Sequence, residues 1–416
     1  MKILLIHPHD MFDPHEPWTI RIESIAREFV RMGHEVKLIH FLSESSVERV
    51  TRHPYGFEVF SFKRRGGMRL FRDNFKHILA EIKWADIVHF QKCFHYVSLP
   101  VLVGAALYEK PVHYDWDDNE EAIYKSSANP PRKMVHFFLK TFERILPKMV
   151  DTVSVASEEL KNKCRAIGVI ERKMYDAPVG ADLKRFGLHV DGAKIRKRFC
   201  NNGKMVIYLG QLNGAQYTTL FIEAVKKIKN KHKDAVFVIV GTGSKFKVLK
   251  RYARKLGVSD VLHFTGAVRH ELVPQYLAAA DIAVACFEDN EITRCKSPLK
   301  IVEYLAAGKA IVASAVGEVK TMLDGCGVLV RPGSSDSLAE GIDKLLVADS
   351  EKIKSIGQAA RKRAEDVYNW PRISQNLIRA YNLALCAHVR PEHAASENLL
   401  RNSRAGTLQC AYTKKI

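Results

Sequence analysis

The segment 297–314, SPLKIVEYLAAGKAIVAS, combines cations with the signals that mark the start of a helix. Pro298 suits the first turn of a helix, and Ser297 stands where a capping residue would stand. The free backbone N–H groups at a helix start bind anions, and Lys296 and Lys300 flank this point. The spacing therefore predicts a site for a phosphate or a similar anion.

Glu303 lies in the same predicted helix, about 1.5 turns beyond its start. A carboxylate at that position can reach a ligand held at the helix start, and a ribose diol is a natural partner for it. The segment thus favours a ligand that carries both phosphate and ribose. The residues alone also fit an ordinary capped helix whose charges are solvated.

A second group of polar side chains follows the first predicted strand. His7, His9, Asp10, Asp13 and His15 lie close together, and imidazoles with carboxylates meet the ligand chemistry of a transition metal. A solvated polar loop or a loop that contacts a substrate explains the same residues, and we expect no metal here. The eight cysteines contain no CxxC pair, so they predict no zinc site and suit a reducing compartment.

Short apolar runs and helical patterns alternate along most of the chain. Strand, helix, glycine and strand follow one another within about 40 residues at the start, which is typical of a βαβ unit with a parallel sheet. We predict two doubly wound, Rossmann-like α/β domains that face each other across a cleft. The boundaries are 1–178 for the first domain, 179–202 for a linker, 203–367 for the second domain, 368–387 for a carboxyl-terminal helix and 388–416 for a flexible tail. The strands are expected at 2–7, 35–39, 87–90, 111–114 and 152–156, then at 205–209, 236–240, 261–264, 282–286, 310–313 and 327–330.

The formal net charge of +19 is unevenly distributed. Residues 1–180 hold 27 Lys+Arg against 24 Asp+Glu, whereas residues 181–416 hold 38 against 22. The excess therefore belongs to the second half, which suits an anionic ligand. The apolar runs are shorter than the ~20 residues that a membrane-spanning helix needs, and the amino terminus does not fit a signal peptide. We expect a cytoplasmic protein, and we recognise no nucleic-acid-binding module.

Several motifs in order resemble GT-B glycosyltransferases, in particular glycosyltransferase family 4. The segment 297–314 is similar to their carboxyl-terminal signature, and the resemblance is strong over residues 205–330 and weak in the amino-terminal half. The other similar segments are 157–160, 179–182, 208–210, 220–224, 238–243, 256–266 and 276–281.

The resemblance implies a retaining, metal-independent transfer of a sugar from a nucleotide diphosphate donor. The donor would lie on the second domain, and a saccharide or lipid-linked saccharide acceptor mostly on the first. No cofactor is implied. By position, Glu303 would bind the donor ribose. The other donor-side positions are Ser297, Pro298 and Leu299 for the diphosphate, Gly210, Gly241 and Gly243 for the loop floor, and Val268 for the base.

The chain departs from this pattern at the residues that usually contact the donor. The first of the family's two carboxylates is replaced by Cys295, and its diphosphate-binding Arg and Lys by Gln211 and Gln216. Because a leaving diphosphate gains negative charge, fixed cations stabilise the transition state. We expect Lys300 to supply such a cation as a catalytic residue, together with Arg294 and Lys296. The alternative is a relative with little or no activity.

The resemblance also points to residues in the first domain. Asp117 takes the place of a histidine that often follows the strand at 111–114, and we predict that it faces the sugar. A carboxylate there can hold sugar hydroxyls or stabilise an oxocarbenium ion. The remaining acceptor-side candidates are Asp115, His89, His7 and His9.

Two basic and aromatic stretches, at 62–76 and 132–144, suit contact with an anionic membrane at its cytoplasmic face. Ordinary amphipathic helices explain them equally well. Another enzyme class, a nucleotide-sugar epimerase on the same fold, stays open at this point.

Overall fold

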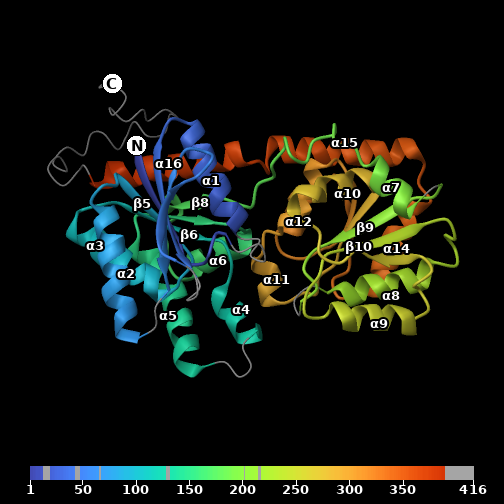
Figure 1. The fold of residues 1–416 in the computed structure, drawn as a ribbon, viewed down its shortest axis with the longest axis horizontal. Coiled ribbons are helices and arrows are strands. Elements are labelled where there is room, and N and C mark those ends of the chain that lie inside the picture. The colour runs from blue at the N-terminus through green and yellow to red at the C-terminus, as the bar shows by residue number, and fades with distance from the viewer. Residues whose placement is uncertain are drawn as a thin grey trace. The chain divides into compact units, whose positions relative to one another are not determined.

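The structure is a computed structural model that describes residues 1–12, 19–42, 47–64, 67–127, 132–200, 202–213 and 217–388. The chain forms two compact units (Figure 1). The first unit contains Met1–Ala156, Leu160–Ala177 and the chain from Ile373 onward, and the second contains Ser157–Glu159 and Pro178–Arg372. Each unit has its own sheet with helices on both faces, which is the doubly wound α/β class predicted above.

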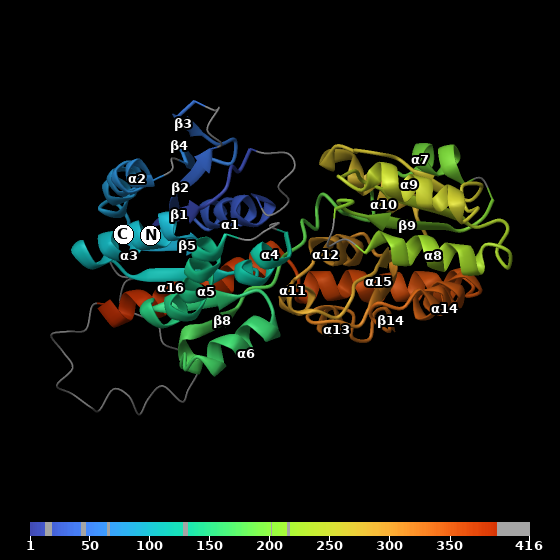
Figure 2. The ribbon, with the colours of Figure 1, turned by 90° about the horizontal axis from the view of Figure 1, so that it is seen from below.

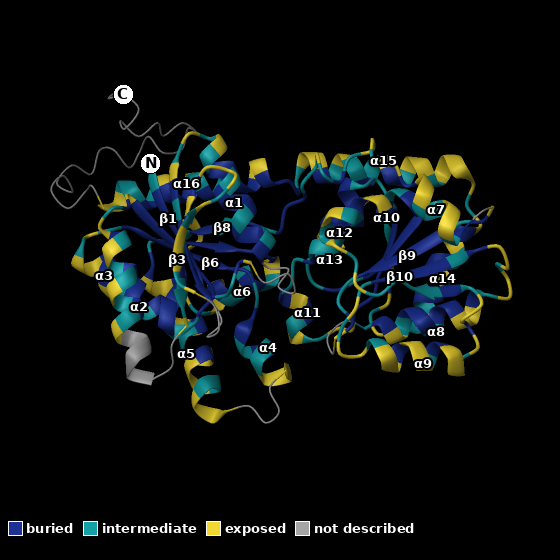
Figure 3. Ribbon diagram, viewed as in Figure 1, coloured by how far each residue is buried: buried dark blue, intermediate teal, exposed yellow. Residues whose placement is uncertain are grey.

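The first sheet has eight strands in the order β3-β4-β2-β1-β5-β6-β7-β8. All neighbours are parallel except β3 and β4. The central strands are continuous apolar runs because helices cover them on both sides, and they are buried throughout (Figure 3). The strands are β1 (Lys2–His7), β2 (Glu35–Leu42), β3 (Arg49–Arg52), β4 (Glu58–Lys63), β5 (Ile87–Gln91), β6 (Val112–Trp116), β7 (Thr152–Val155) and β8 (Met174–Asp176).

The helices of the first unit connect these strands, and a final helix, α16 (Trp370–His388), returns to it from the second unit. In α16, Tyr381 is fully buried and its hydroxyl lies 2.6 Å from Nδ1 of His89. The other helices are α1 (Thr19–Arg31), α2 (Gly67–Ile82), α3 (His95–Leu107), α4 (Glu120–Ser127), α5 (Lys133–Met149), α6 (Glu158–Ala166) and the 3-10 turn Glu171–Lys173.

The second sheet has six parallel strands in the order β11-β10-β9-β12-β13-β14. The chain runs outward from β9 in one direction, then crosses over and runs outward from β12 in the other. Ligands of open parallel sheets bind at such a reversal, outside the carboxyl ends of the strands. The strands are β9 (Met205–Leu209), β10 (Val236–Val240), β11 (Leu262–Phe264), β12 (Ile282–Ala285), β13 (Ala310–Ser314) and β14 (Val328–Val330).

Helices cover both faces of this second sheet (Figure 2). On one face α8, α9 and α14 enclose a core with Tyr208, Phe221 and Phe237 at its centre. On the other face lie α10, α12 and α15. The helices are α7 (Ala193–Phe199), α8 (Thr218–Ile228), α9 (Phe246–Lys255), α10 (Val273–Ala279), α11 (Glu291–Cys295), α12 (Leu299–Ala306), α13 (Val319–Met322), α14 (Ser335–Leu346), α15 (Ser350–Asp366) and the 3-10 turn His270–Leu272.

The predicted strands agree with these strands to within a few residues at each end. No strand was predicted at β3 and β4, an antiparallel pair at one edge of the first sheet, or at β8, which forms the other edge. The predicted linker, 179–202, falls within the second unit and contains α7, which packs on α10. Of the predicted tail, residues 389–416 lie outside the described part of the chain. Among the described helices, none combines the length and the apolar character needed to cross a bilayer.

Candidate functional site

Helix α12 begins at Leu299, with Pro298 in the capping position in an extended conformation. Ser297 does not cap the helix as predicted, because its hydroxyl accepts a hydrogen bond from the backbone N–H of Val179 at 2.9 Å. No side chain caps this helix. The N–H of Ile301 in its first turn donates to the carbonyl of Pro298 at 3.0 Å, and the uncapped start of the helix carries the positive end of the helix dipole, which favours an anionic ligand.

Tyr304 holds α12 at the point where the strand order of the second sheet reverses. Its buried hydroxyl accepts the N–H of Leu209 at 2.9 Å and donates to the carbonyl of Val284 at 3.2 Å. Leu209 ends β9 and Val284 lies in β12, the two strands that flank the reversal. The helix is thus anchored at the edge of the sheet where a ligand is expected.

Glu303 is 6 % exposed, and its Oε1 lies 2.9 Å from Nε2 of His270. Within the described chain, no hydrogen bond or ion pair reaches Oε2 of Glu303. One carboxylate oxygen is therefore fixed by the protein, and the other is left for a ligand. His270 was not among the residues predicted for the site. Its position in the sequence could have indicated it, because His270 follows closely after Val268, a predicted donor-side residue. Val268 is partly buried in the loop after β11.

Lys300 points toward the carboxyl ends of β9 and β12. Its Nζ lies 4.3 Å from the centre of the Tyr208 ring and 5.8 Å from that of Phe287. Burial lowers the pKa of Lys300 to about 8, and the charge of Lys296 lowers it further, whereas Cys286 and Glu303 oppose the shift. A cation that is partly stripped of water and beside a second cation gains from an anionic ligand.

Arg294, also expected to bind the diphosphate, forms an ion pair with a nearby carboxylate. Its Nε donates to Oδ1 of Asp289 at 2.5 Å, and about half of each side chain is exposed. Cys295, which stands where the family has a carboxylate, is fully buried. Lys296 and Lys300 are thus the two cations that accompany the start of α12 and Glu303.

The glycine loops after β9 and β10 pack directly on each other. Gly210 and Gly241 have φ angles of 147° and 139°, and a Cβ atom on Gly241 would lie 2.0 Å from the carbonyl oxygen of Gly210. A side chain at Gly243 would lie 2.7 Å from the carbonyl carbon of Leu212. These glycines therefore let two loops meet at the ligand edge. Gln211 is partly buried in the first loop, and Gln216 lies outside the described residues.

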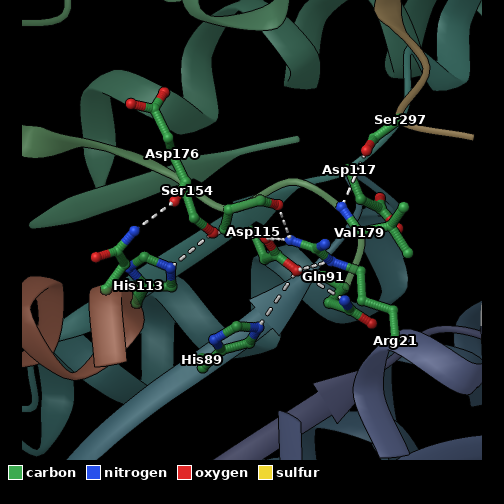
Figure 4. A network of polar contacts seen from close by, with 12 residues as sticks. Arg21, His89, Gln91, His113, Asp115, Asp117, Ser154, Asp176, Val179 and Ser297 are labelled. Carbon is green, nitrogen blue, oxygen red and sulfur yellow. Dashed lines mark hydrogen bonds and ion pairs between the residues drawn. The ribbon is translucent and has the colours of Figure 1, made fainter. Parts of the chain in front are cut away.

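Asp115 in the first unit is the centre of a buried polar network (Figure 4). Arg21 of α1 donates from Nε and Nη2 to its two oxygens at 2.8 Å and 2.7 Å. Gln91 and Ser154 donate to it at 2.7 Å and 2.5 Å. The Arg21 guanidinium holds the pKa of Asp115 well below its usual range, although burial opposes this. The structure therefore makes Asp115 a structural anion, fully enclosed by protein.

Asp117 lies two residues further on, just beyond β6, and is 9 % exposed. Burial raises its pKa to about 7, and so do Asp118 and Asp115, whereas Lys92 and Arg21 oppose the shift. Nζ of Lys92 lies 3.2 Å from Oδ1 of Asp117.

Lys92 was missed by the sequence analysis. It follows β5 directly, is 2 % exposed and has a left-handed φ of 64°. Its ammonium also pairs with Glu120, which begins α4. The backbone N–H of Lys92 donates to the carbonyl of Asp115 at 3.3 Å. A strained backbone that brings a buried cation to a carboxylate is common at functional sites.

The histidine candidates lie inside the first unit. His7 and His89 are fully buried, and Nδ1 of His7 donates to Gln91 at 2.8 Å. Burial lowers the pKa of His7 to about 3 and that of His9 to about 2. The His9 ring packs edge-on against Phe94 at 5.2 Å. The described residues contain no cluster of three metal-ligating side chains, and Asp13 and His15 lie outside them.

The two basic and aromatic stretches differ in structure. The first is divided between the end of β4 and α2, with residues 65–66 outside the described part. The second is α5, which exposes Met134, Phe137 and Phe138 by 71 %, 64 % and 38 %.

Two family patterns match the chain in succession. Residues 19–185 match Glycosyltransferase Family 4, and residues 193–363 match Glycosyl transferases group 1. The first match lies mostly in the first unit and the second in the second unit.

Curated relatives and solved structures agree with these matches. The D-inositol 3-phosphate glycosyltransferase of Geodermatophilus obscurus is 26 % identical over 58 % of this chain and 54 % of its own length. A GDP-mannose-dependent alpha-(1-6)-phosphatidylinositol monomannoside mannosyltransferase of Mycolicibacterium smegmatis is 27 % identical over 56 % of this chain and 62 % of its own length. The matches thus span little more than half of these relatives.

The similarity of fold extends over nearly the whole chain. A sucrose-phosphate synthase from Thermosynechococcus elongatus superposes with a TM-score of 0.73 at 18 % identity, covering 93 % of this chain and all of that one. Anabaena HepE in complex with UDP superposes with a TM-score of 0.69 at 16 % identity, covering 92 % of this chain and all of that one. With both family patterns and this fold, the chain belongs to the GT-B glycosyltransferases of the family 4 type.

Proposed function

We propose that this protein transfers a sugar, with retention and without a metal, from a nucleotide diphosphate donor to a saccharide or lipid-linked saccharide. The observation that carries the proposal is the arrangement at α12. An uncapped helix start, Lys296, Lys300 and a carboxylate oxygen of Glu303 without a protein partner meet at the reversal of the second sheet. This set suits a diphosphate joined to a ribose.

Within this proposal, Lys300 and Lys296 stabilise the charge that develops on the leaving diphosphate. The Nζ of Lys300 lies on aromatic rings, where little water competes for it. Preorganised cations in such surroundings stabilise a growing anion more than they would in water. Two lysines from α12 and its start thereby take over from the family's Arg and Lys, replaced here by Gln211 and Gln216.

The acceptor side is assigned to the first unit, with Asp117 as the carboxylate that faces the sugar. Relatives named for phosphatidylinositol mannosides and for inositol phosphate support a lipid-linked or small polar acceptor. The exposed apolar residues of α5, beside Lys133, Lys140 and Arg144, suit contact with the cytoplasmic face of an anionic membrane. We therefore place the reaction in the cytoplasm, at that face.

A screen of nucleotide sugars and nucleoside diphosphates by thermal shift tests the donor part. Nucleotides that carry one particular base are expected to raise the melting temperature in a saturable manner, because a ligand that binds only the folded state stabilises that state. Incubation with that donor and no acceptor should leave the sugar unchanged. A C2-epimerised sugar would instead indicate an epimerase, and a chain that binds no nucleotide would overturn the proposal.

The rate of transfer is expected to fall as the pH drops below about 7, because Asp117 must be ionised to stabilise a cationic sugar. The charged groups that face Asp117 are Lys92 from the loop after β5, Arg21 from α1, and Asp115 and Asp118. Between pH 8 and pH 6 the ionised fraction of such a group falls roughly tenfold.

The measurement is kcat/KM against pH, with donor binding followed over the same range as the control. Asp117→Asn should lower the rate and remove the acidic limb, while donor binding stays as in the wild type. If kcat/KM of Asp117→Asn falls at low pH as it does in the wild type, the fall is caused by the titration of another group.

A further inference from the structure

Helix α9 carries five cations and no acidic residue in ten positions, FKVLKRYARK. At about 100° per residue, all five lie within an arc of about 140°. Leu249 and Ala253, which are buried, point to the opposite side. The five cations are Lys247, Lys250, Arg251, Arg254 and Lys255, all exposed, and we call them the α9 stripe.

Some cations of the neighbouring helix are balanced by carboxylates. Lys227 and Lys229, in and just after α8, pair with Asp336 and Asp260. In the described part of the chain, no residue of the α9 stripe forms an ion pair. Glu223 of α8, which faces α9, accepts instead from the hydroxyl of Tyr252 at 2.8 Å. The stripe is therefore a surface of one sign that the protein itself leaves uncompensated.

The stripe also repels itself. Members three or four positions apart are neighbours on a helix, and like charges at these spacings weaken it. The helix dipole offsets this for Arg254 and Lys255, which lie in the last turn, but not for Lys247, Lys250 and Arg251. An external anionic partner would relieve the repulsion at all five.

We infer that the α9 stripe is a docking surface for the anionic headgroups of a lipid bilayer. It runs for about 12 Å along one helix face, and its long side chains need no fixed partner geometry, which suits a fluid plane of charges. Val248, 53 % exposed, lies at the border of the stripe. A nucleic-acid surface would instead offer a groove or exposed aromatic rings. Phe246 packs against Phe264, and Tyr252 is bonded to Glu223.

This inference deepens the proposed function, since a lipid-linked acceptor lies at such a surface. It adds a contact in the second unit, separate from α5 and from the nucleotide site. Each Lys or Arg near an anionic bilayer strengthens binding about fivefold. The stripe as a whole is thus expected to control whether the protein stays on the membrane.

The test is sedimentation of the full chain with vesicles of phosphatidylcholine alone or with about 30 % phosphatidylglycerol. The wild type should bind the anionic vesicles at about 0.1 M salt and be released at about 0.5 M. In the test variant all five stripe residues are replaced by Gln, which keeps the helix propensity. Its partition coefficient for anionic vesicles should fall by roughly 100-fold or more.

A matched control removes five cations from α7 and α15, on the opposite face of the sheet: Lys194, Lys197, Lys352, Lys354 and Lys362, each replaced by Gln. It should bind as the wild type does, and both variants should keep nucleoside diphosphate binding. Equal losses in both variants would mean general charge attraction and would overturn the inference. So would a wild type that ignores anionic vesicles, or one that binds only an oligonucleotide. If the wild type bound no nucleoside diphosphate, that result would count against the proposed function and not against the α9 stripe.

Discussion

Glu303→Ala is expected to raise the dissociation constant for a nucleoside diphosphate by roughly 100-fold, so that binding no longer saturates in the range that saturates the wild type. A hydrogen bond from a ligand to a charged acceptor contributes about 1.5–3 kcal/mol, and a ribose diol offers two donors. Oε2 of Glu303 is open to such donors because Oε1 is held by His270. Isothermal titration with the base identified by thermal shift measures the effect.

The control is Glu340→Ala, which removes an exposed glutamate of α14 from the same unit. It should bind the nucleotide as the wild type does and show that a change of net charge alone has no effect. Glu303→Gln should lie between the two, because the amide keeps one acceptor oxygen. If Glu303→Ala binds normally, α12 does not hold the ribose.

A large loss of stability is expected when the buried cation beside Asp115 is removed. Arg21→Met should lower the free energy of unfolding of the first unit by about 3–5 kcal/mol, because it leaves Asp115 charged and buried without its cation. Arg21 also donates to the carbonyl of Ala177 at 2.8 Å, so the variant loses this hydrogen bond as well as the two to Asp115.

The pH dependence of this loss follows from the lowered pKa of Asp115. The folded wild type binds the proton less tightly than the unfolded chain. The ion pair therefore stabilises the fold above about pH 4, and this contribution is lost as the pH falls below that value. The difference between wild type and Arg21→Met should narrow in acid. Urea unfolding at pH 7 and at about pH 2.5 measures this difference in the free energy of unfolding.

The control is Arg172→Met, at an exposed residue of the same unit that forms no ion pair within the described chain. It should change the free energy of unfolding little. Adding Asp115→Asn to Arg21→Met should recover part of the loss, because an amide leaves no buried charge. A double variant that is less stable than Arg21→Met would contradict this account.

The central strands could be predicted because their apolar runs are buried on both sides. Residues 205–209 and 236–240 match β9 and β10 at both ends. The strands that were not predicted lie at or next to the edges of the first sheet: β8 has three residues, β4 is partly polar, and β3, with the sequence RVTR, has no apolar run to mark it. The helix start near Ser297 was also predictable, because its signals are local in the chain.

The partners of the site residues could not be predicted from spacing. Asp115 is held by Arg21, 94 residues away, and Glu303 by His270, 33 residues away. Such pairs depend on which strands become neighbours, and no local pattern contains that information. The partner of Ser297 was unpredictable for the same reason. Its hydroxyl, expected to cap α12, instead accepts a hydrogen bond from the backbone N–H of Val179.

The return of α16 to the first unit sets an order for folding during synthesis. Residues 1–177 leave the ribosome early, but Tyr381, which fills the space beside His89, is made only after the whole second unit. The second unit needs only residues up to Arg372 and can complete its core first. While residues 178–372 are made, the nascent first unit therefore lacks the helix that covers His89 and Phe29, and uncovered surfaces of this kind are ones that chaperones bind.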